Sequence, residues 1–447
     1  MSAAPSHPDP RGADPSGADP READPSEADP REAAPSIADP RRVAFAAALR
    51  VASLRCALSL AAALSLPVAL AAPPPPAQQA PVEARIPWVP AAVPASDGRA
   101  HLAYELHLSN FYRATGTLRV VRVEVYADDA PTPLARFEGQ ALSRLDAAPA
   151  PQEGQAGQDI AIDGGQRKVL FVWLDLPAGA PAPTALRHRI EFVDAHGKRS
   201  WIDGAPATLS AAAPVVLGPP LAGGAWMAYE GPSNARSHHW GSVVVANGET
   251  TIPQRYALDL IGLDSRGRAV DARGGELAKT RHRDWFGYGA PVLAVADGTV
   301  RAARDGQPER APLSPQPEPA ALSADDLYGN YVILQIAPAV YVHYAHLLPG
   351  SVAPKAGERV RRGQVVGRLG QSGNSGGPHL HLHVSNAATF EQSEGLPFVF
   401  ERFDALGRRS IDQALAQPPD PTYAPAPQPR RAQMPLDGEV IGFDPPR

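Results

Sequence analysis

The stretch Ser372-Gly373-Asn374-Ser375-Gly376-Gly377-Pro378-His379-Leu380-His381-Leu382-His383 places three histidines at alternate positions of a predicted β-strand. Alternate residues of a strand point to the same face of a sheet, so the three imidazoles share one face. A core strand would carry apolar side chains there, and each buried imidazole would need a hydrogen-bond partner. The pattern therefore favours a metal or catalytic site over a solvated or structurally satisfied row of histidines.

The spacing limits which of these histidines can share one ion. His379 and His383 are four residues apart, so their Cα atoms lie about 13 Å from each other in an extended strand. Two side chains at that separation do not easily bind the same ion. His381 lies between them and can pair with either, which makes it the strongest candidate ligand of the three.

The N-terminal region predicts export. Residues 1–42 run through an Asp-Pro repeat with no apolar face, which is typical of disorder. Residues 43–72 combine arginines, a short apolar run and Ala69-Leu70-Ala71, as a Sec-type signal peptide does. An uncleaved anchor is disfavoured because the run is short and rich in Ala and Ser. A repeat ahead of a signal also raises the hypothesis that translation starts downstream, at Val43 or Val51. We expect a periplasmic or secreted protein with no stable membrane span after cleavage.

Composition excludes several kinds of chemistry. The single cysteine, Cys56, lies within the predicted signal peptide. The mature chain would therefore have no disulfide, cysteine nucleophile or thiolate metal ligand, and any metal site must use His, Asp or Glu. The formal net charge of −5, with no long basic run, argues against a nucleic-acid partner.

The mature chain is predicted to begin with a Pro-rich linker, residues 73–86, and a β domain, residues 87–212. Short runs of period-two hydrophobicity, separated by turn residues, indicate an antiparallel sandwich of immunoglobulin-like type in the β domain. Four histidines in this domain share no spacing that suggests a site, and we expect them on the surface: His101, His107, His188 and His196.

A second all-β domain is predicted for residues 223–390, where most of the other histidines lie. Because its candidate site residues all follow Gly223, we expect this domain to fold and bind metal without the first. Residues 304–327 are Pro-rich and charged and predict a long exposed loop. Residues 413–447 are predicted to be a Pro-rich tail that runs over the surface.

The second domain resembles the lysostaphin/LytM-type zinc endopeptidases, which cut peptides of peptidoglycan. The resemblance covers about residues 223–388. It rests on five segments in order: Ala-Val-Ala-Asp-Gly-Thr-Val (294–300), Gly-Asn-Tyr-Val (329–332), Tyr-Ala-His-Leu (344–347), Gly-Gln-Val-Val-Gly (363–367) and Ser-Gly-Gly-Pro-His-Leu-His (375–381). It implies an all-β fold in which a compact β-sheet metallopeptidase domain follows the immunoglobulin-like sandwich.

The resemblance also implies a ligand set. Typical members bind zinc through His-x-x-x-Asp and the second histidine of His-x-His, but here Arg255 stands four residues before Asp259. The segment Arg-Tyr-Ala-Leu-Asp (255–259) resembles a divergent branch in which an earlier Asn-x-His segment supplies the first histidine. The residues in that place are Asn-Ala-Arg-Ser-His-His (234–239). The predicted zinc ligands are His239, Asp259 and His381, with His238 as the alternative to His239.

This donor set suits hydrolysis. Three nitrogen or carboxylate ligands leave one position of a tetrahedral zinc site open, and zinc activates water at neutral pH. Attack on a peptide carbonyl also needs a base and an oxyanion donor. His346 and His379 are the candidates, as the resemblance also implies. The chain has no helical His-Glu-x-x-His arrangement, which excludes a thermolysin-type site.

Four neighbouring residues receive lesser roles. His343 is three residues from His346 on a predicted strand, so it should face the other way and lie on the surface. His383 stands where the family often has an acid and is expected to support a ligand. Asn330 and Ser375 are expected to orient the substrate.

Two functions follow from the resemblance. The first is a zinc endopeptidase that hydrolyses peptide cross-links of peptidoglycan, with the sandwich gating or positioning the substrate. The second is a non-catalytic relative that activates cell-wall amidases. Such relatives lack metal or base histidines, whereas this chain keeps all of them, and this favours the enzyme.

Overall fold

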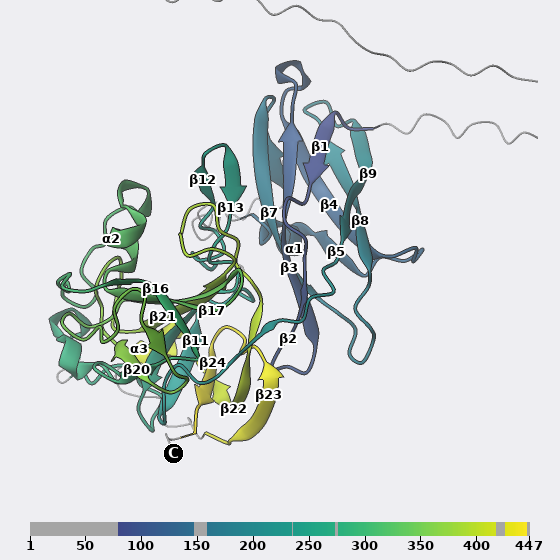
Figure 1. Ribbon diagram of the computed structural model, residues 1–447. Helices are drawn as coiled ribbons and strands as arrows, with labels where there is room; N and C mark the ends of the chain where they lie inside the picture. The colour runs from purple at the N-terminus through teal and green to yellow at the C-terminus, as the bar shows by residue number, and fades with distance from the viewer. Residues whose placement is uncertain (1–78, 147–158, 235, 273–275, 417–424, 445–447) are drawn as a thin grey trace, which may run out of the picture. The chain divides into compact units, whose positions relative to one another are not determined.

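The computed structural model describes residues 79–146, 159–234, 236–272, 276–416 and 425–444 (Figure 1). The repeat predicted for residues 1–42 and the signal peptide predicted for residues 43–72 lie outside the described residues. The described residues all belong to one compact unit. The described part is mostly strand, with three α-helices of one turn or slightly more, as the all-β prediction requires. None of its helices has the length and apolar character needed to span a bilayer.

Two antiparallel sheets form the first part of this unit. One sheet contains β1 (Val82–Arg85), β2 (Ala92–Pro94), β3 (Ala100–Asn110) and β7 (Gln166–Asp175). The other contains β4 (Leu118–Ala127), β5 (Ala135–Glu138), β6 (Ile160–Ile162), β8 (Ala185–Val193) and β9 (Arg199–Thr208). Apolar residues of both sheets, such as Leu106 and Val123, share one core. This is a β-sandwich; its immunoglobulin-like type remains a prediction. Short helices η1 (Arg113–Thr115) and α1 (Gly139–Ser143) connect its strands.

Strand β3 is buried on both faces, which corrects the surface prediction for three sandwich histidines. Its residues from His101 to Asn110 are all buried. One face packs into the sandwich core, while Ala103 on the other face belongs to the core of the second part. His101 and His107 lie on the same face as Ala103 and are buried; His101 contacts Asp97 and Asp175 and stacks on Trp173 of the sandwich. His188 is buried inside the sandwich, and of the four only His196 is exposed.

The second part is built on an eleven-stranded sheet of order β10-β22-β24-β11-β14-β21-β18-β17-β16-β19, with β23 paired to β22. Its strands are β10 (Val215–Leu217), β11 (Ala225–Tyr229), β14 (Leu258–Leu263), β16 (Gly298–Arg304), β17 (Tyr331–Ala337), β18 (Val340–Ala345), β19 (Arg359–Val360), β21 (Leu380–Ser385), β22 (Phe398–Arg408), β23 (Gln428–Gln433) and β24 (Glu439–Gly442). Strands β14 and β21 are entirely buried and lie at the middle of the sheet.

Residues 413–447 are not a surface tail over their described part, as the sequence had predicted. Strand β24 lies between β11 and β22 and pairs with both. Its Val440 and Ile441 are fully buried. Figure 1 shows β22, β23 and β24 side by side. Burial of these apolar side chains holds the segment in the sheet despite the prolines around it.

Short elements complete the second part. Two small two-stranded sheets pair β12 (Val244–Ala246) with β13 (Glu249–Thr251), which form a hairpin, and β15 (Pro291–Leu293) with β20 (Val365–Arg368). The helices are η2 (Leu277–Lys279), η3 (His282–Asp284), η4 (Pro319–Ala321), α2 (Ala324–Tyr328) and α3 (Ile411–Leu415). The long loop predicted at residues 304–327 contains η4 and most of α2. Its Glu309 accepts a hydrogen bond from the backbone N–H of Gln371 at 2.7 Å, so the loop packs against the segment that precedes His379.

Candidate metal centre

Asp259 and His381 face each other across two central strands. Antiparallel pairing of β14 with β21 places them directly opposite each other, so their side chains lie on the same face of the sheet. Oδ1 of Asp259 lies 3.1 Å from Nδ1 of His381. Both residues are buried. The sheet register alone therefore brings these two predicted ligands together.

His239 reaches the same point from the segment between β11 and β12. Its Nδ1–H donates to the backbone carbonyl of Glu230 at 3.0 Å, which leaves Nε2 with a free lone pair. That Nε2 lies 3.1 Å from Nδ1 of His381 and 3.4 Å from Oδ1 of Asp259. All three predicted ligands therefore point their donor atoms at one another.

The spacing of these atoms fits a tetrahedral metal site. Zinc bonds to nitrogen and oxygen of about 2.0–2.1 Å imply ligand atoms about 3.3 Å apart, and the three separations here are 3.1, 3.1 and 3.4 Å. Two imidazole nitrogens and a carboxylate oxygen that converge without an intervening cation would repel one another. His239, Asp259 and His381 thus offer the donor atoms and the spacing that a zinc ion requires.

His238 remains an alternative ligand. Ligand atoms of His238, His239 and Asp259 all lie within 4.8 Å of one another. The His238 side chain is 66% exposed, however, and its Nδ1 pairs with the carboxylate of Glu230 at 3.2 Å. The closer approach of His381 favours His381 as the third ligand, with His238 as a neighbour held by Glu230.

The two predicted catalytic histidines line the same site. His379 directs Nε2 to within 3.3 Å of Oδ1 of Asp259, while its Nδ1–H donates to the carbonyl of Gly377 at 2.8 Å. His346 donates its Nδ1–H to the carbonyl of Ser372 at 2.8 Å, so its Nε2 is free. The two rings are 4.7 Å apart between centroids. The structure thus places both imidazoles beside the metal ligands; Nε2 of His346 is left for a reacting group, whereas Nε2 of His379 faces Asp259.

His346 also has an unusual backbone. It follows the last residue of β18 with a φ of 62°, a left-handed conformation that non-glycine residues seldom adopt. Its N–H donates to the carbonyl of Tyr328 at 2.9 Å and holds this turn. Such strain is found at functional sites, where the surrounding structure enforces it. Here it turns the imidazole out of the strand and towards His379.

The electrostatics of the site keep the Asp259 carboxylate charged and the imidazoles of His346 and His381 neutral. Burial would raise the pKa of Asp259, but the nearby His379 and His239 outweigh it and hold that pKa well below its ordinary value. Burial, helped by the charge of neighbouring His379, lowers the pKa of His346 well below its usual range. Burial also lowers the pKa of His381, to about 4. Neutral imidazoles are the form that can bind a metal or accept a proton.

A chain of buried polar groups continues from His381 away from Asp259. Nε2 of His381 lies 2.9 Å from Nδ1 of His383, and Nε2 of His383 lies 3.2 Å from the Tyr328 hydroxyl. That hydroxyl lies 3.3 Å from Nδ1 of His343, whose Nε2 contacts the hydroxyl of Ser385 at 2.8 Å. Metal-binding histidines commonly use their second nitrogen in this way.

This chain corrects one prediction and locates another. His343 is fully buried, not on the surface, because it pairs with His383 across β18 and β21 and stacks on it at 4.2 Å. His383 contacts His381 on the side away from Asp259, which is the supporting position predicted for it. Tyr328 was missed because nothing in its sequence context distinguishes it from a core tyrosine.

The two residues expected to orient substrate instead hold the local loops. The side chain of Asn330 is fully buried and bonds to the backbone of Gln307 and Leu347. The Ser375 hydroxyl donates to the carbonyl of Gly377 at 2.8 Å, next to Nδ1 of His379. Ser375 can therefore help to place His379, whereas Asn330 has no polar atom directed at the site.

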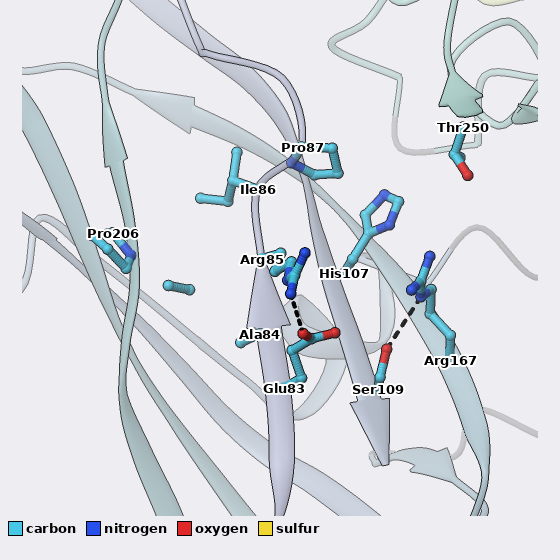
Figure 2. Close-up of a pocket in the computed structure, with 11 residues that line it drawn as sticks. Glu83, Ala84, Arg85, Ile86, Pro87, His107, Ser109, Arg167, Pro206 and Thr250 are labelled. Carbon is cyan, nitrogen blue, oxygen red and sulfur yellow. Dashed lines mark hydrogen bonds and ion pairs between the residues drawn. The ribbon is translucent and has the colours of Figure 1, made fainter. Parts of the chain in front are cut away.

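A pocket of about 500 Å³ lies apart from these residues (Figure 2). Its charged lining groups are already paired: Arg85 contacts Glu83 at 2.6 Å, and Arg167 donates to Ser109 at 3.1 Å. It contains none of the candidate ligands or catalytic histidines. We assign no function to it.

Two histidines and one aspartate converge on a β-sheet, with two further histidines beside them. This arrangement is that of a β-sheet metallopeptidase centre. Residues 284–392 match the sequence profile of Peptidase family M23, so this catalytic region of the chain is of the M23 (lysostaphin/LytM) type. The match includes His346, His379 and His381 but begins after His239 and Asp259.

Curated relatives agree over the same region. The chain is 36% identical over 138 residues to the DD-carboxypeptidase/endopeptidase Mpg of Neisseria gonorrhoeae, which covers 27% of this chain and 29% of the relative. It is 42% identical over 143 residues to the peptidoglycan DD-endopeptidase ShyA of Vibrio cholerae, covering 29% and 27%. The chain thus spans less than a third of the length of these relatives.

Among solved structures, the catalytic domain of lysostaphin from Staphylococcus simulans is 20% identical. The match covers 34% of this chain and 80% of that domain, with a TM-score of 0.19. This score is too low for the likeness to add to the assignment. The family therefore rests on the sequence of the catalytic region.

Proposed function

We propose that this protein is a zinc-dependent endopeptidase that hydrolyses peptide cross-links of bacterial peptidoglycan, in the periplasm or outside the cell. The observation that carries the proposal is the convergence of His239, Asp259 and His381 at 3.1–3.4 Å, beside the imidazoles of His346 and His379. The DD-endopeptidase activity in the names of similar proteins supports this substrate class.

Each group has a role that its position supports. His239, Asp259 and His381 would hold the zinc ion. When bound, zinc supplies the Lewis acidity that peptide hydrolysis needs at neutral pH. His346 presents an unprotonated Nε2, suited to accept a proton from the attacking water. His379 carries a raised pKa because the charge of Asp259 outweighs the effect of burial, so it suits a hydrogen-bond donor to the developing oxyanion.

The test is a direct assay of the exported form. Purified residues 72–447 should bind one zinc ion per chain and release products from cross-linked muropeptides, with activity lost on chelation and restored by zinc. A protein that binds zinc yet leaves muropeptides intact would contradict the proposal. Such a result would favour the alternative, a non-catalytic activator of cell-wall amidases, which could be examined by adding the protein to an amidase assay.

A further inference from the structure

Glu105 is a buried carboxylate from the sandwich that binds two side chains of the second part. It lies on the face of β3 that is covered by the second part and is 3% exposed. Its Oε2 accepts from Nη2 of Arg255 at 2.8 Å, and its Oε1 accepts from Nε of the same arginine at 2.9 Å. Oε1 also accepts the Nε1–H of Trp240. Every hydrogen-bond partner that the structure gives this carboxylate belongs to the second part.

Arg255 is as deeply buried as Glu105 and fully engaged. Its side chain is 2% exposed, and Nη2 also pairs with Glu394 at 2.7 Å. Nη1 donates to the carbonyl of Gly395 at 3.3 Å. Burial would lower the pKa of this guanidinium, but the two carboxylates raise it further, so the group stays charged. A bidentate, charge-assisted pair of this kind fixes geometry as well as energy.

These partners adjoin the metal ligands in the chain. Trp240 follows His239 directly, and Arg255 stands four residues before Asp259. Phe171 of the sandwich packs edge-on against Trp240 with ring centroids 5.6 Å apart. Glu105 therefore connects the segment that carries His239 to the segment that carries Asp259. The two ligands come from segments that are otherwise separated by the β12–β13 hairpin.

We propose that Glu105 is a positioning residue for the metal centre, so that the sandwich supplies a required part of the peptidase site. This inference rests on the proposed function. By binding Trp240 and Arg255 with one carboxylate, Glu105 sets the distance between His239 and Asp259. Arg255 stands where typical family members have a metal-binding histidine. In this chain, the residue at that position binds Glu105 of the sandwich instead of a metal.

The test compares two buried carboxylates of the sandwich. Glu105→Gln keeps the shape of the side chain but removes its charge. Glu124→Gln is the matched control, because Glu124 is also buried, pairs with Arg136 at 2.8 Å and accepts from Tyr126, all within the sandwich. We expect Glu105→Gln to weaken zinc binding about 10-fold or more, as loss of supporting groups around metal ligands does. Glu124→Gln should leave zinc affinity unchanged, even where it lowers the unfolding midpoint.

Zinc affinity is measured by chelator competition on folded protein, with kcat and KM measured on muropeptides. Equal zinc affinity and equal kcat in the parent and Glu105→Gln would overturn the proposal and leave Glu105 a structural residue only. If Glu105→Gln does not fold, Trp240→Phe removes one of the two contacts and keeps the Glu105–Arg255 pair. It should still weaken zinc binding several-fold, and unchanged affinity would overturn the proposal.

The outcomes also separate this inference from the proposed function. A parent protein that binds zinc but does not cleave muropeptides contradicts the function, while the zinc affinities of the variants still decide the role of Glu105. Conversely, an active parent with an unaffected Glu105→Gln variant supports the function and rejects the positioning role. Glu105→Asp, which keeps the charge on a shorter side chain, should recover part of the lost affinity.

Discussion

Nε2 of His381 lies 2.9 Å from Nδ1 of His383, on the opposite side of the ring from Asp259. Because Nδ1 of His381 faces Asp259 and His239, the proton of this imidazole belongs on Nε2, where His383 accepts it. The amide of Gln254 lies 3.2 Å from the same nitrogen. His383 thus selects the tautomer of His381 that can bind a metal through Nδ1.

Replacing His383 by leucine should therefore weaken zinc binding about 10–100-fold. Leucine fills a similar volume but cannot accept the Nε2–H of His381. His343→Leu is the control, since it removes a buried imidazole of the same chain without touching His381. Chelator competition on both variants is the measurement. Equal zinc affinities would mean that His383 has no part in orienting His381.

Removal of a ligand should empty the site. His381→Ala and His239→Ala are each expected to lower bound zinc to well below one ion per chain, because two remaining ligands leave the site incomplete. His238→Ala should keep its zinc, since His238 pairs with Glu230 and is largely exposed. Metal analysis after gel filtration decides between them. Zinc loss in His238→Ala and zinc retention in His239→Ala would mean that His238, not His239, is the ligand.

His346→Ala separates a catalytic group from a ligand. We expect zinc content and thermal stability close to those of the parent, with cleavage reduced about 10²–10⁴-fold, the range for a positioned acid–base group. His196→Ala, which removes an exposed imidazole of the sandwich, is the control for activity. Loss of zinc together with activity would show that His346 is itself a ligand.

His188 should make the unfolding free energy depend on pH. Burial lowers its pKa to about 4 in the folded state, against about 6.5 for an unfolded chain. The unfolded state therefore binds more protons between these values, so stability is full above pH 6.5 and falls as the pH drops towards 4. The contribution of one such group is at most about 1.4 kcal/mol per pH unit.

His188→Gln tests this with zinc removed by a chelator, so that metal binding does not enter. Urea unfolding at pH 7 and pH 5 should show a smaller loss of stability for the variant than for the parent. The Tyr104 hydroxyl, 2.8 Å from Nε2 of His188, can still bond to the amide. An unchanged pH dependence would mean that His188 is not the titrating group.

A fragment beginning at Gly223 should not behave as an independent zinc peptidase. It lacks Val93, Ala103 and Phe171, which belong to the core of the second part, and it leaves Arg255 without Glu105. Loss of one partner from a buried ion pair costs about 3–5 kcal/mol. We expect aggregation or a midpoint lowered by roughly 10 °C, measured by thermal unfolding beside residues 72–447. A fragment that matches the longer chain in midpoint and zinc content would restore the independent domain expected from the sequence.

The strand that carries His381 could be predicted because alternation of polar and apolar residues is typical of a β-strand with one polar face. Alternating histidines and leucines at residues 379–383 fix a strand and its polar face, and the structure brings His379, His381 and His346 together on that side. His239 was placed only through resemblance to a family segment. Its convergence with Asp259 depends on contacts with Glu230 that no local pattern contains.

The burial of β3, the Glu105–Arg255 pair and strand β24 could not be predicted from the sequence, for physical reasons. The polar face of β3 alternates in the same way whether water or protein covers it, so His101 and His107 were expected on the surface although both are buried. Glu105 and Arg255 are 150 residues apart in sequence, and no spacing rule relates them. Strand β24 is four residues long and follows a Pro-rich segment, too short for its periodicity to stand out.

The position of β24 has a consequence for the order of assembly. Because β24 separates β11 from β22, the large sheet has a gap beside β11 until residues 439–442 arrive. Strand β11 pairs on its other side with β14, which carries Asp259. A partly synthesised chain therefore has every candidate ligand but lacks the strand that closes the sheet next to them. The sheet around the candidate ligands is therefore completed only after its last strand has been synthesised.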